Sequence, residues 1–522
     1  MTTEIRETEQ KYEAEGDVRL PPLDGLPRVA AVSGPEVETL TAEYYDTDDL
    51  RLLWAGSTLR RREGGADEGW HLKLPERAAG QGRRAAKAAG PTSRRELRLP
   101  VNQPADPVPD ELGRLVLAHT RGAPLRPIAL IETRRSLTTL RDSSGASLAE
   151  VAVDDVSAQT LGSSTTLSRW NEIEVELTGG DPRLLKATDE RLRRSGLRAA
   201  GRSAKLERAL AADLPPAPAG HRLTRRSPSG EVVLAYLDEH AARLKSLDPA
   251  VRRDEPDSIH QMRVATRRLR STLQAFPMIV PEPATRHLRE DLKWLGGLLG
   301  DARDGDVLSD YLRTELDGLP TELVIGPAKA RVTVHFAPRE ASARAGVREA
   351  LNSPRYLGML DELDRLIGDP PLTAEAAEPA AEVLPRAVAR AGRRTMRRMR
   401  RARRAPAGTA RDLRLHDTRK AAKRARYAAE AAGPASGKRA RRFACHMKRV
   451  QSVLGDHNDA VLAAAEVREI GIQAHLAGEN AFSFGLLHER AHQDALRQQG
   501  KARRTWKHVT RSTSREWLAS RS

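Results

Sequence analysis

The sequence lacks the features that mark secreted, membrane-spanning and base-stacking proteins. Among 522 residues the single cysteine, Cys445, cannot form an intrachain disulfide and fits a reducing cytoplasm. No run of eighteen apolar residues occurs and the amino terminus is acidic, so we expect neither a membrane span nor a signal peptide. Aromatic residues make up 3% of the chain, too few for obvious base-stacking platforms. The length predicts roughly two to four domains.

The positive charge is concentrated in the second part of the chain. Residues 1–212 carry 32 Lys and Arg against 33 Asp and Glu, whereas the remainder carries 56 against 38. Twelve of the fourteen histidines also lie beyond residue 212. This division predicts a charge-balanced domain followed by a domain that binds a polyanion. Because aromatics are scarce, a polymer of phosphates without bases fits that partner as well as nucleic acid does.

The first part contains eight candidate strands separated by clusters of Gly, Pro, Asp and Ser. They are Glu7–Lys11, Glu43–Thr47, Ser57–Arg62, Trp70–Leu74, Arg94–Arg98, Ile128–Leu140, Ser147–Asp154 and Trp170–Leu177. Two helical stretches follow, Pro182–Leu197 and Ser203–Leu210. Closing such strands into a barrel would collect alternate residues of each strand in the interior, where basic and acidic rows could neutralise each other around a charged guest.

Rows of charge occur at alternate positions of these strands. Glu7, Glu9 and Lys11 share one strand face, and the stretch from Glu172 to Glu176 alternates carboxylates with apolar residues. A solvated sheet face is the ordinary explanation for one such row alone. If these rows face a barrel interior, the carboxylates could bind magnesium, which prefers carboxylate oxygens, and the ammonium group of Lys11 could bind phosphate. No cluster of His or Cys indicates zinc.

The order of the motifs resembles the CYTH family of triphosphate tunnel metalloenzymes over about residues 4–212. The order runs Glu-x-Glu-x-Lys, Tyr-Asp-Thr, Leu-Arg-x-Arg, Trp-x-Leu-Lys, Arg-x-Glu, Arg-Arg, an Asp after a short strand, Glu-x-Glu-x-Glu and Lys-x-Glu-Arg-Ala-Leu. The resemblance implies an eight-stranded antiparallel tunnel that hydrolyses or cyclises triphosphates with Mg²⁺ or Mn²⁺.

The resemblance also implies roles for individual residues. The metal ligands would be Glu7, Glu9, Asp154, Glu172, Glu174 and Glu176. The phosphate ligands would be Lys11, Arg60, Arg62, Lys73, Arg134 or Arg135, and Lys205. Catalysis would fall to Glu7, Glu9, Lys11, Asp154, Glu174 and Glu176. The chain departs from the family pattern at Arg98, His71 and Ala204, which leaves the substrate open.

An internal repeat follows a Pro-rich stretch, residues 213–227, that is typical of a linker. Ile259–Arg270 recurs as Leu415–Arg426, and Leu292–Asp304 recurs as Met447–Asp459, at offsets of 156 and 155 residues. We therefore expect a domain boundary near residue 212 and a helical domain over 228–515, with halves at about 228–368 and 385–515.

Each repeat carries a basic stripe at helical spacing. His260, Arg263, Arg267 and Arg270 form the first stripe, and His416, Arg419, Lys423 and Arg426 form the second. One stripe alone would be explained by a solvated face, but two in register indicate a shared basic groove. The histidines could instead begin helices or be satisfied core groups. Asp301, Asp304, Asp456 and Asp459 could bind metal or pair with the stripe arginines.

The repeated His-x-x-Arg-x-x-x-(Arg/Lys)-x-x-Arg and Leu-Gly-Asp-x-(Arg/Asn)-Asp motifs resemble the CHAD family of histidine-containing helical domains over about residues 228–515. The resemblance implies an all-α domain of two pseudo-repeated four-helix bundles that binds inorganic polyphosphate through a basic channel. Lys293 and Lys448 of the repeated segments would join the two stripes in binding it. CHAD domains often follow a CYTH domain in one chain, which fits both halves here.

Together these observations predict a cytoplasmic, metal-dependent inorganic triphosphatase with a polyphosphate-binding domain, and polyphosphate granules are a candidate location. One alternative is a binding or granule-targeting protein whose tunnel retains polyphosphate without turnover. A second is a nucleotide cyclase, which would need a base pocket that the sequence does not indicate. A third is nucleic-acid binding by the basic half, although nucleic acid is not the expected partner. The preferred metal, substrate chain length and oligomeric state stay open.

Overall fold

The computed structural model describes residues 3–512, apart from 15, 17–18, 77–90, 102–106, 163–164, 202–203, 213 and 215–221. The chain divides into two units, Met1–Gly220 and His221–Ser522, each taken separately below. Most of the expected linker's first part, 213–221, lies outside the described residues, as do residues 513–515. Within the described ranges, no helix is both long and apolar enough to cross a membrane.

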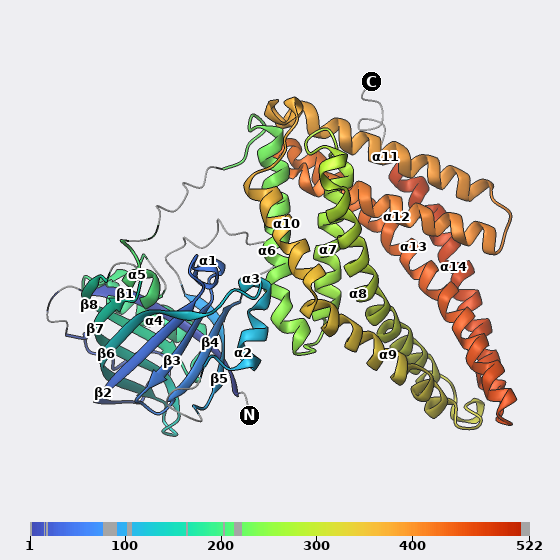
Figure 1. Cartoon of the computed structure of the whole chain (residues 1–522). Helices are drawn as coiled ribbons and strands as arrows, with labels where there is room; N and C mark the ends of the chain where they lie inside the picture. The colour runs from blue at the N-terminus through green and yellow to red at the C-terminus, as the bar shows by residue number, and fades with distance from the viewer. Residues whose placement is uncertain are drawn as a thin grey trace. The chain divides into compact units, whose positions relative to one another are not determined.

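Eight strands of the first unit close into an antiparallel barrel (Figure 1). They are β1 (Thr3–Ala14), β2 (Ala31–Asp46), β3 (Thr58–Glu63), β4 (Gly69–Pro75), β5 (Thr92–Leu99), β6 (Arg126–Arg141), β7 (Ser147–Thr160) and β8 (Leu167–Leu177). The sheet runs β5-β4-β3-β2-β6-β7-β8-β1, and β1 also pairs with β5, which closes the ring. A two-residue strand, β9 (Arg198–Ala199), adds to β1. All eight predicted strands are confirmed.

The apolar core of this unit lies largely outside the barrel wall. Helix α4 (Pro182–Arg194) begins after Asp181, whose carboxylate accepts hydrogen bonds from the backbone of Arg183 and Leu184. Its buried Leu184 packs with outward-facing residues such as Val151 and Val175. On another part of the wall, α1 (Arg51–Ala55) and α2 (Asp110–Leu115) help to enclose a second apolar cluster, and α3 (Leu117–Thr120) packs against α1. Since alternate strand residues face opposite sides, the polar residues between them face inward.

Helix α5 (Lys205–Ala209) contributes apolar residues to the barrel interior. Leu206 packs with Ile131 and Val156, which lie on the same strand faces as the inward-facing Arg135 and Asp154. Burying these side chains provides the anchor for a short helix that could not be stable alone. The same helix begins with Lys205 and thereby carries an ammonium group into the charged part of the interior.

The second unit is helical and contains two matching halves (Figure 1). The first comprises α6 (Ser229–Arg252), α7 (Ser258–Ala275), α8 (Glu282–Asp317) and α9 (Ala328–Asn352), with α10 (Pro354–Gly368) packed on α6, α8 and α9. The second comprises α11 (Ala380–Arg404), α12 (Thr409–Ala431), α13 (Gly433–Leu476) and α14 (Phe482–Ser512). An eight-stranded antiparallel barrel with accompanying helices (α+β), followed by an all-α unit, confirms the predicted fold class.

The halves of the helical unit contact each other at several places, including a contact between α6 and α11. At one place α7 packs against α12, so the helices that carry the repeated stripes are neighbours. At another, the far ends of the α8–α9 and α13–α14 hairpins share an apolar core, in which Leu316 and Phe336 pack with Ile470 and Phe484 (Figure 1). The shared apolar core buries the ends of the two hairpins. The stripe helices α7 and α12 meet at a different place, away from this core.

Candidate functional site

Strand register brings the predicted acidic and basic rows of the barrel together. Lys11 of β1 lies opposite Glu174 of β8, and Glu9 lies opposite Glu176. Asp154 of β7 lies opposite both Arg135 of β6 and a glutamate of β8. Directly opposed residues in an antiparallel pair point to the same face, so these side chains all enter the barrel interior.

Three carboxylates surround the ammonium group of Lys205. Its Nζ lies 2.9 Å from Asp154 Oδ2, 2.8 Å from Glu172 Oε1 and 2.6 Å from Glu174 Oε1. The three residues offer oxygens within 4.8 Å of one another. Although burial opposes its charge, these carboxylates raise the pKa of Lys205 well above its ordinary value. The trio therefore holds a cation at its centre, and its oxygens are of the type that a hard divalent ion requires.

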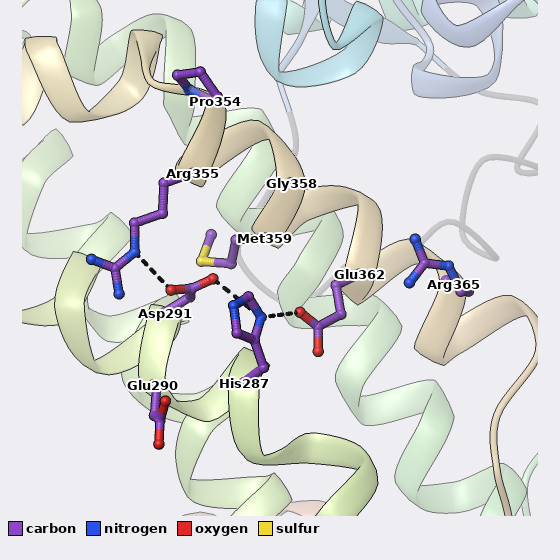
Figure 2. Close-up of a pocket in the computed structure, with 9 residues that line it drawn as sticks. All are labelled: His287, Glu290, Asp291, Pro354, Arg355, Gly358, Met359, Glu362 and Arg365. Atoms are coloured by element: carbon purple, nitrogen blue, oxygen red, sulfur yellow. Dashed lines mark hydrogen bonds and ion pairs between the residues drawn. The ribbon is translucent and has the colours of Figure 1, made fainter.

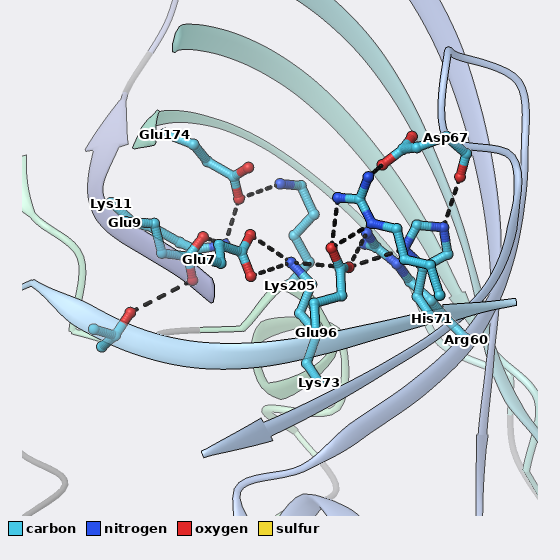
Figure 3. Close-up of polar contacts among 12 residues, drawn as sticks. Glu7, Glu9, Lys11, Arg60, Asp67, His71, Lys73, Glu96, Glu174 and Lys205 are labelled. Carbon is cyan, nitrogen blue, oxygen red and sulfur yellow. Dashed lines mark hydrogen bonds and ion pairs between the residues drawn. The ribbon is translucent and has the colours of Figure 1, made fainter. Parts of the chain in front are cut away.

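Arg135 and Lys11 complete the charge balance around the trio. Arg135 donates two hydrogen bonds to Asp154, from Nε at 2.8 Å and from Nη2 at 2.7 Å, and Nη2 also lies 2.7 Å from Glu174 Oε2. Lys11 donates to Glu174 and lies 3.3 Å from Glu9 Oε2 (Figure 3). Burial of Glu174 opposes ionisation, but Lys11, Lys205 and Arg135 outweigh it and hold its pKa well below the usual range.

A second cluster connects β1, β3, β4 and β5. Lys73 Nζ lies 2.6 and 2.7 Å from the two oxygens of Glu7 and 3.6 Å from Glu96 Oε1 (Figure 3). Arg60 Nη2 lies 3.8 Å from the same Glu96 oxygen, and Arg60 Nη1 donates to the hydroxyl of Tyr44 at 3.2 Å. Burial opposes the charge of Arg60, yet the charges of Tyr44 and Glu96 raise its pKa. The barrel interior thus holds two neighbouring groups of fixed cations.

Glu176 differs from the other interior carboxylates. No described residue forms an ion pair with it, although its position opposite Glu9 places it among acidic neighbours. Burial, together with the charges of Glu7, Glu9 and Glu174, raises the pKa of Glu176 to about 7. This side of the interior consequently has more carboxylate than cation, which favours the entry of an additional positive charge.

Sequence reasoning missed Glu96 and the role of His71. Glu96 is 1% exposed and also accepts a hydrogen bond from Arg98 Nε at 2.7 Å. His71 places Nδ1 2.8 Å from Glu96 Oε1 and Nε2 2.7 Å from the carbonyl of Asp67, and burial lowers its pKa to about 4. Glu96 lies within a predicted strand, in one alternating row with Arg94 and Arg98, and this row was the available signal.

Two predicted phosphate ligands have distinct surroundings. Arg62 is buried and pairs with Asp67; burial, followed by the nearby Arg60, lowers its pKa to about 9. Arg134 is exposed and lies opposite Asp155. Of the predicted pair, only Arg135 faces the barrel interior, and the structure does not bring Arg134 into the charged cluster.

In the helical unit the two stripes face each other across the α7–α12 contact. Burial, and then the charges of Arg267, Arg419 and Arg263, lower the pKa of Lys423 to about 7. Like charges gathered so closely form a strongly cationic surface that an anion would stabilise. Lys293 and Lys448 are exposed on α8 and α13. Burial is the first cause that lowers the pKa of His260 and of His416, and nearby stripe cations add to it.

Matching anchors hold the stripe arginines in the two repeats. Arg263 Nη1 lies 2.7 Å from Asp304, and Arg419 Nη1 lies 3.9 Å from Asp459. The predicted pairing of motif aspartates with stripe arginines is confirmed for these two, while Asp301 and Asp456 are exposed. A methyl group at Gly300 or Gly455 would come within 3.3 or 3.2 Å of the respective arginine Nη2. Glycine at this motif position therefore lets the guanidinium lie against the helix.

Two stripe arginines, together with Arg268, surround the buried Tyr427. Arg267 Nε donates to Tyr427 Oη at 3.0 Å, and the guanidinium groups of Arg267, Arg268 and Arg426 lie 5.5–5.8 Å from its ring centre. Arg426 Nε also donates to Glu430 at 2.7 Å. Burial lowers the pKa of Arg270, with a contribution from Arg289. The contact between the halves is thus cationic and specifically packed.

Comparison with known proteins places both units. The uncharacterized proteins Rv2226 and MT2285 of two Mycobacterium tuberculosis strains are each 35% identical to this chain over 496 residues, 92% of either sequence. Among solved structures, PptA from Streptomyces chartreusis is 20% identical with a TM-score of 0.45, covering 54% of this chain and all of its own. The CHAD domain from the plant Ricinus communis is 26% identical with a TM-score of 0.42, covering 59% and 98%.

The family models match in the predicted order. The CYTH domain model matches residues 6–205, which include every strand of the barrel and its charged interior. The CHAD domain model matches residues 235–468, which include both basic stripes. The chain therefore belongs to the proteins in which a CYTH domain is followed by a CHAD domain.

Proposed function

We propose that the barrel is a phosphoanhydride hydrolase that cleaves inorganic triphosphate or short polyphosphate with Mg²⁺ or Mn²⁺. The observation that carries this proposal is the convergence of Asp154, Glu172 and Glu174 on one cation, next to Arg135 and Lys11. A triphosphate carries about four negative charges, and its transfer reactions depend on positioning and charge stabilisation rather than on covalent chemistry from the protein. Fixed cations beside hard oxygen ligands meet both needs.

The carboxylates present fit a divalent metal. Asp154, Glu172 and Glu174 offer oxygens that already converge, and Glu7, Glu9 and Glu176 add carboxylates on the adjoining strands. The raised pKa of Glu176 supports this assignment, because it marks negative charge that no described cation pairs. When bound, Mg²⁺ or Mn²⁺ would supply Lewis-acid stabilisation of phosphate oxygens and would orient a water molecule.

The basic residues would bind and align the phosphates. Arg135 presents a planar fork suited to two phosphate oxygens, and Arg60 and Lys73 stand in the neighbouring cluster. Lys11 and Lys205, now bound to carboxylates, would turn part of their hydrogen bonding to phosphate. Because these groups are buried and held by ion pairs, they need little reorganisation when charge develops. Glu96 and His71 would position Arg60 and Lys73 rather than contact the reacting atoms.

The helical unit would bind polyphosphate through its two stripes and raise the local concentration of substrate for the barrel. The like-charge cluster around Lys423 supports this role, because a polyanion relieves its repulsion. With such a ligand we propose a cytoplasmic location, with polyphosphate granules as a candidate site. Duplex DNA that competes with polyphosphate at equal phosphate concentration would instead support nucleic-acid binding.

Phosphate release from inorganic triphosphate tests the barrel assignment. The intact chain should release phosphate only with Mg²⁺ or Mn²⁺, and Glu7→Gln combined with Glu174→Gln should abolish release. Glu190→Gln, which changes an exposed carboxylate of α4, is the matched control and should remain active. Absence of release alongside retained polyphosphate binding would support the non-catalytic alternative. Formation of cyclic nucleotide and pyrophosphate from ATP would support a cyclase.

A further inference from the structure

A pocket of about 530 Å³ lies between α8 and α10 of the helical unit (Figure 2). It contains neither a residue of the basic stripes nor a residue of the barrel. His287 and Asp291 enter it from α8 and Glu362 enters it from α10 (Figure 2). The i, i+4 spacing on α8 places His287 and Asp291 on one helix face, where both can reach a common ligand.

The three side chains converge with a geometry that metal ligands share. His287 Nδ1 lies 2.8 Å from Glu362 Oε2 and 3.6 Å from Asp291 Oδ2, and the three ligand atoms lie within 4.8 Å of one another. Asp291 is 2% exposed, whereas the side chain of His287 is 76% exposed. The group therefore joins a deeply fixed carboxylate to an imidazole that solvent can reach, which gives an ion an entry path.

Arg355 fixes the orientation of the buried carboxylate. Its Nε donates to Asp291 Oδ1 at 2.8 Å, and its guanidinium stacks 4.4 Å from the ring centre of Trp294. Asp291 Oδ2 receives no hydrogen bond from any described residue and points toward His287 (Figure 2). A ligand carboxylate held through its other oxygen is the arrangement that sustains ordered metal sites.

We propose that His287, Asp291 and Glu362 bind a divalent transition-metal ion, with zinc preferred, and that the ion joins α8 to α10. One imidazole nitrogen and two carboxylate oxygens are a donor set for zinc, and the pocket leaves room for water as a fourth ligand. Two carboxylates beside a neutral imidazole also balance the charge of the ion.

Metal titration of the full chain tests the proposal. Chelator-treated protein would be titrated with Co²⁺, followed by its visible absorption, and with Zn²⁺ by equilibrium dialysis. His287→Ala and Glu362→Gln should each lower the affinity for one zinc equivalent by at least about 10–100-fold, the loss that follows even from changing a partner of a ligand. His492→Ala, which removes an exposed histidine of α14, should bind as the unaltered chain does. The helical circular dichroism of His287→Ala should equal that of the unaltered chain, because the His287 side chain is largely exposed.

The outcome separates this site from the metal proposed for the barrel. Glu174→Gln should retain the zinc equivalent and its cobalt spectrum, while triphosphate hydrolysis should be unaffected by His287→Ala. Equal zinc stoichiometry and affinity in the unaltered chain, His287→Ala and Glu362→Gln would overturn the proposal. So would loss of the equivalent in Glu174→Gln alone, since the ion would then belong to the barrel.

Discussion

Replacing Lys205 with methionine should separate two roles of its ammonium group. Without metal the ammonium neutralises Asp154, Glu172 and Glu174. In the variant Asp154 and Glu174 keep their ion pairs with Arg135 and Lys11, whereas Glu172 loses its ion pair with Lys205. Removing one partner from a buried ionic cluster costs about 3–5 kcal/mol. For a unit of this size, that cost lowers the unfolding temperature of the barrel by about 6–20 °C in the presence of chelator.

Metal should reverse this loss in Lys205→Met more strongly than in the unaltered chain. A divalent ion that binds the same carboxylates meets no competing ammonium in the variant, so its affinity should rise. At one hundred times the dissociation constant, binding to the folded state alone adds about 2.7 kcal/mol. Phosphate release should nevertheless fall, because a phosphate ligand is lost. Metal affinity and turnover should thus change in opposite directions.

Thermal unfolding of the full chain, followed by tryptophan fluorescence with chelator or with Mg²⁺ or Mn²⁺, measures both effects. Trp170 reports on the site, because its Nε1 donates to Glu172 Oε2 at 2.7 Å. Lys186→Met, which alters an exposed lysine of α4, is the matched control and should unfold as the unaltered chain does. Equal stabilisation of the unaltered chain and Lys205→Met by metal would refute the view that ammonium and metal share these carboxylates.

Two further predictions concern neighbouring arginines and the helical stripe. Arg135→Met should lower the rate of phosphate release about 10²–10³-fold, because a buried bidentate donor is lost. Arg134→Met, which changes the exposed side of the same strand, should keep a rate close to that of the unaltered chain in the same assay. The second prediction concerns polyphosphate affinity, measured by titration calorimetry between pH 7 and 9. The pKa of Lys423 is about 7 in the free protein, and bound phosphates favour its charged form. The affinity should therefore fall with rising pH, by at most about tenfold per pH unit.

Comparison of Arg134→Met with Arg135→Met, and of Lys423→Met with the unaltered chain, gives the results that would contradict these two predictions. Equal loss of activity in Arg134→Met and Arg135→Met would contradict the assignment of only one of them to the interior. Lys423→Met should bind polyphosphate weakly but with a nearly flat pH profile over the same range. The pKa values of His260 and His416 are lowered in the free protein, mainly by burial, which moves their titration away from this window. An unchanged pH slope in Lys423→Met would show that another group takes up the proton.

Alternation within strands was sufficient to predict that Glu7, Glu9 and Lys11 share one strand face, because the period of two survives folding, but it did not choose between Arg134 and Arg135 and it missed Glu96. The same pattern underestimated the length of β2, because the predicted strand began only at Glu43. Gly34 and Pro35 account for the omission of residues 31–35 alone, and the structure absorbs them in a register shift between Ser33 and Glu36. The pattern gave no indication that α5 would contribute apolar residues to the interior. The α8–α10 pocket was equally hidden, because Glu362 lies 75 residues from His287 and belongs to no motif.

The interior of the barrel is organised so that its two proposed ligands should assist each other. Lys11, Lys205 and Arg135 each form an ion pair with a carboxylate. Without metal and phosphate, therefore, the cations occupy the carboxylates that would bind metal, and the carboxylates occupy the cations that would bind phosphate. Phosphates that attract these cations would weaken the ion pairs of Asp154, Glu172 and Glu174, and the affinity of those carboxylates for a divalent ion would rise. Carboxylates bound to an ion would in turn release the cations to phosphate. Since coupling between two sites is reciprocal, each ligand must strengthen the binding of the other by the same factor.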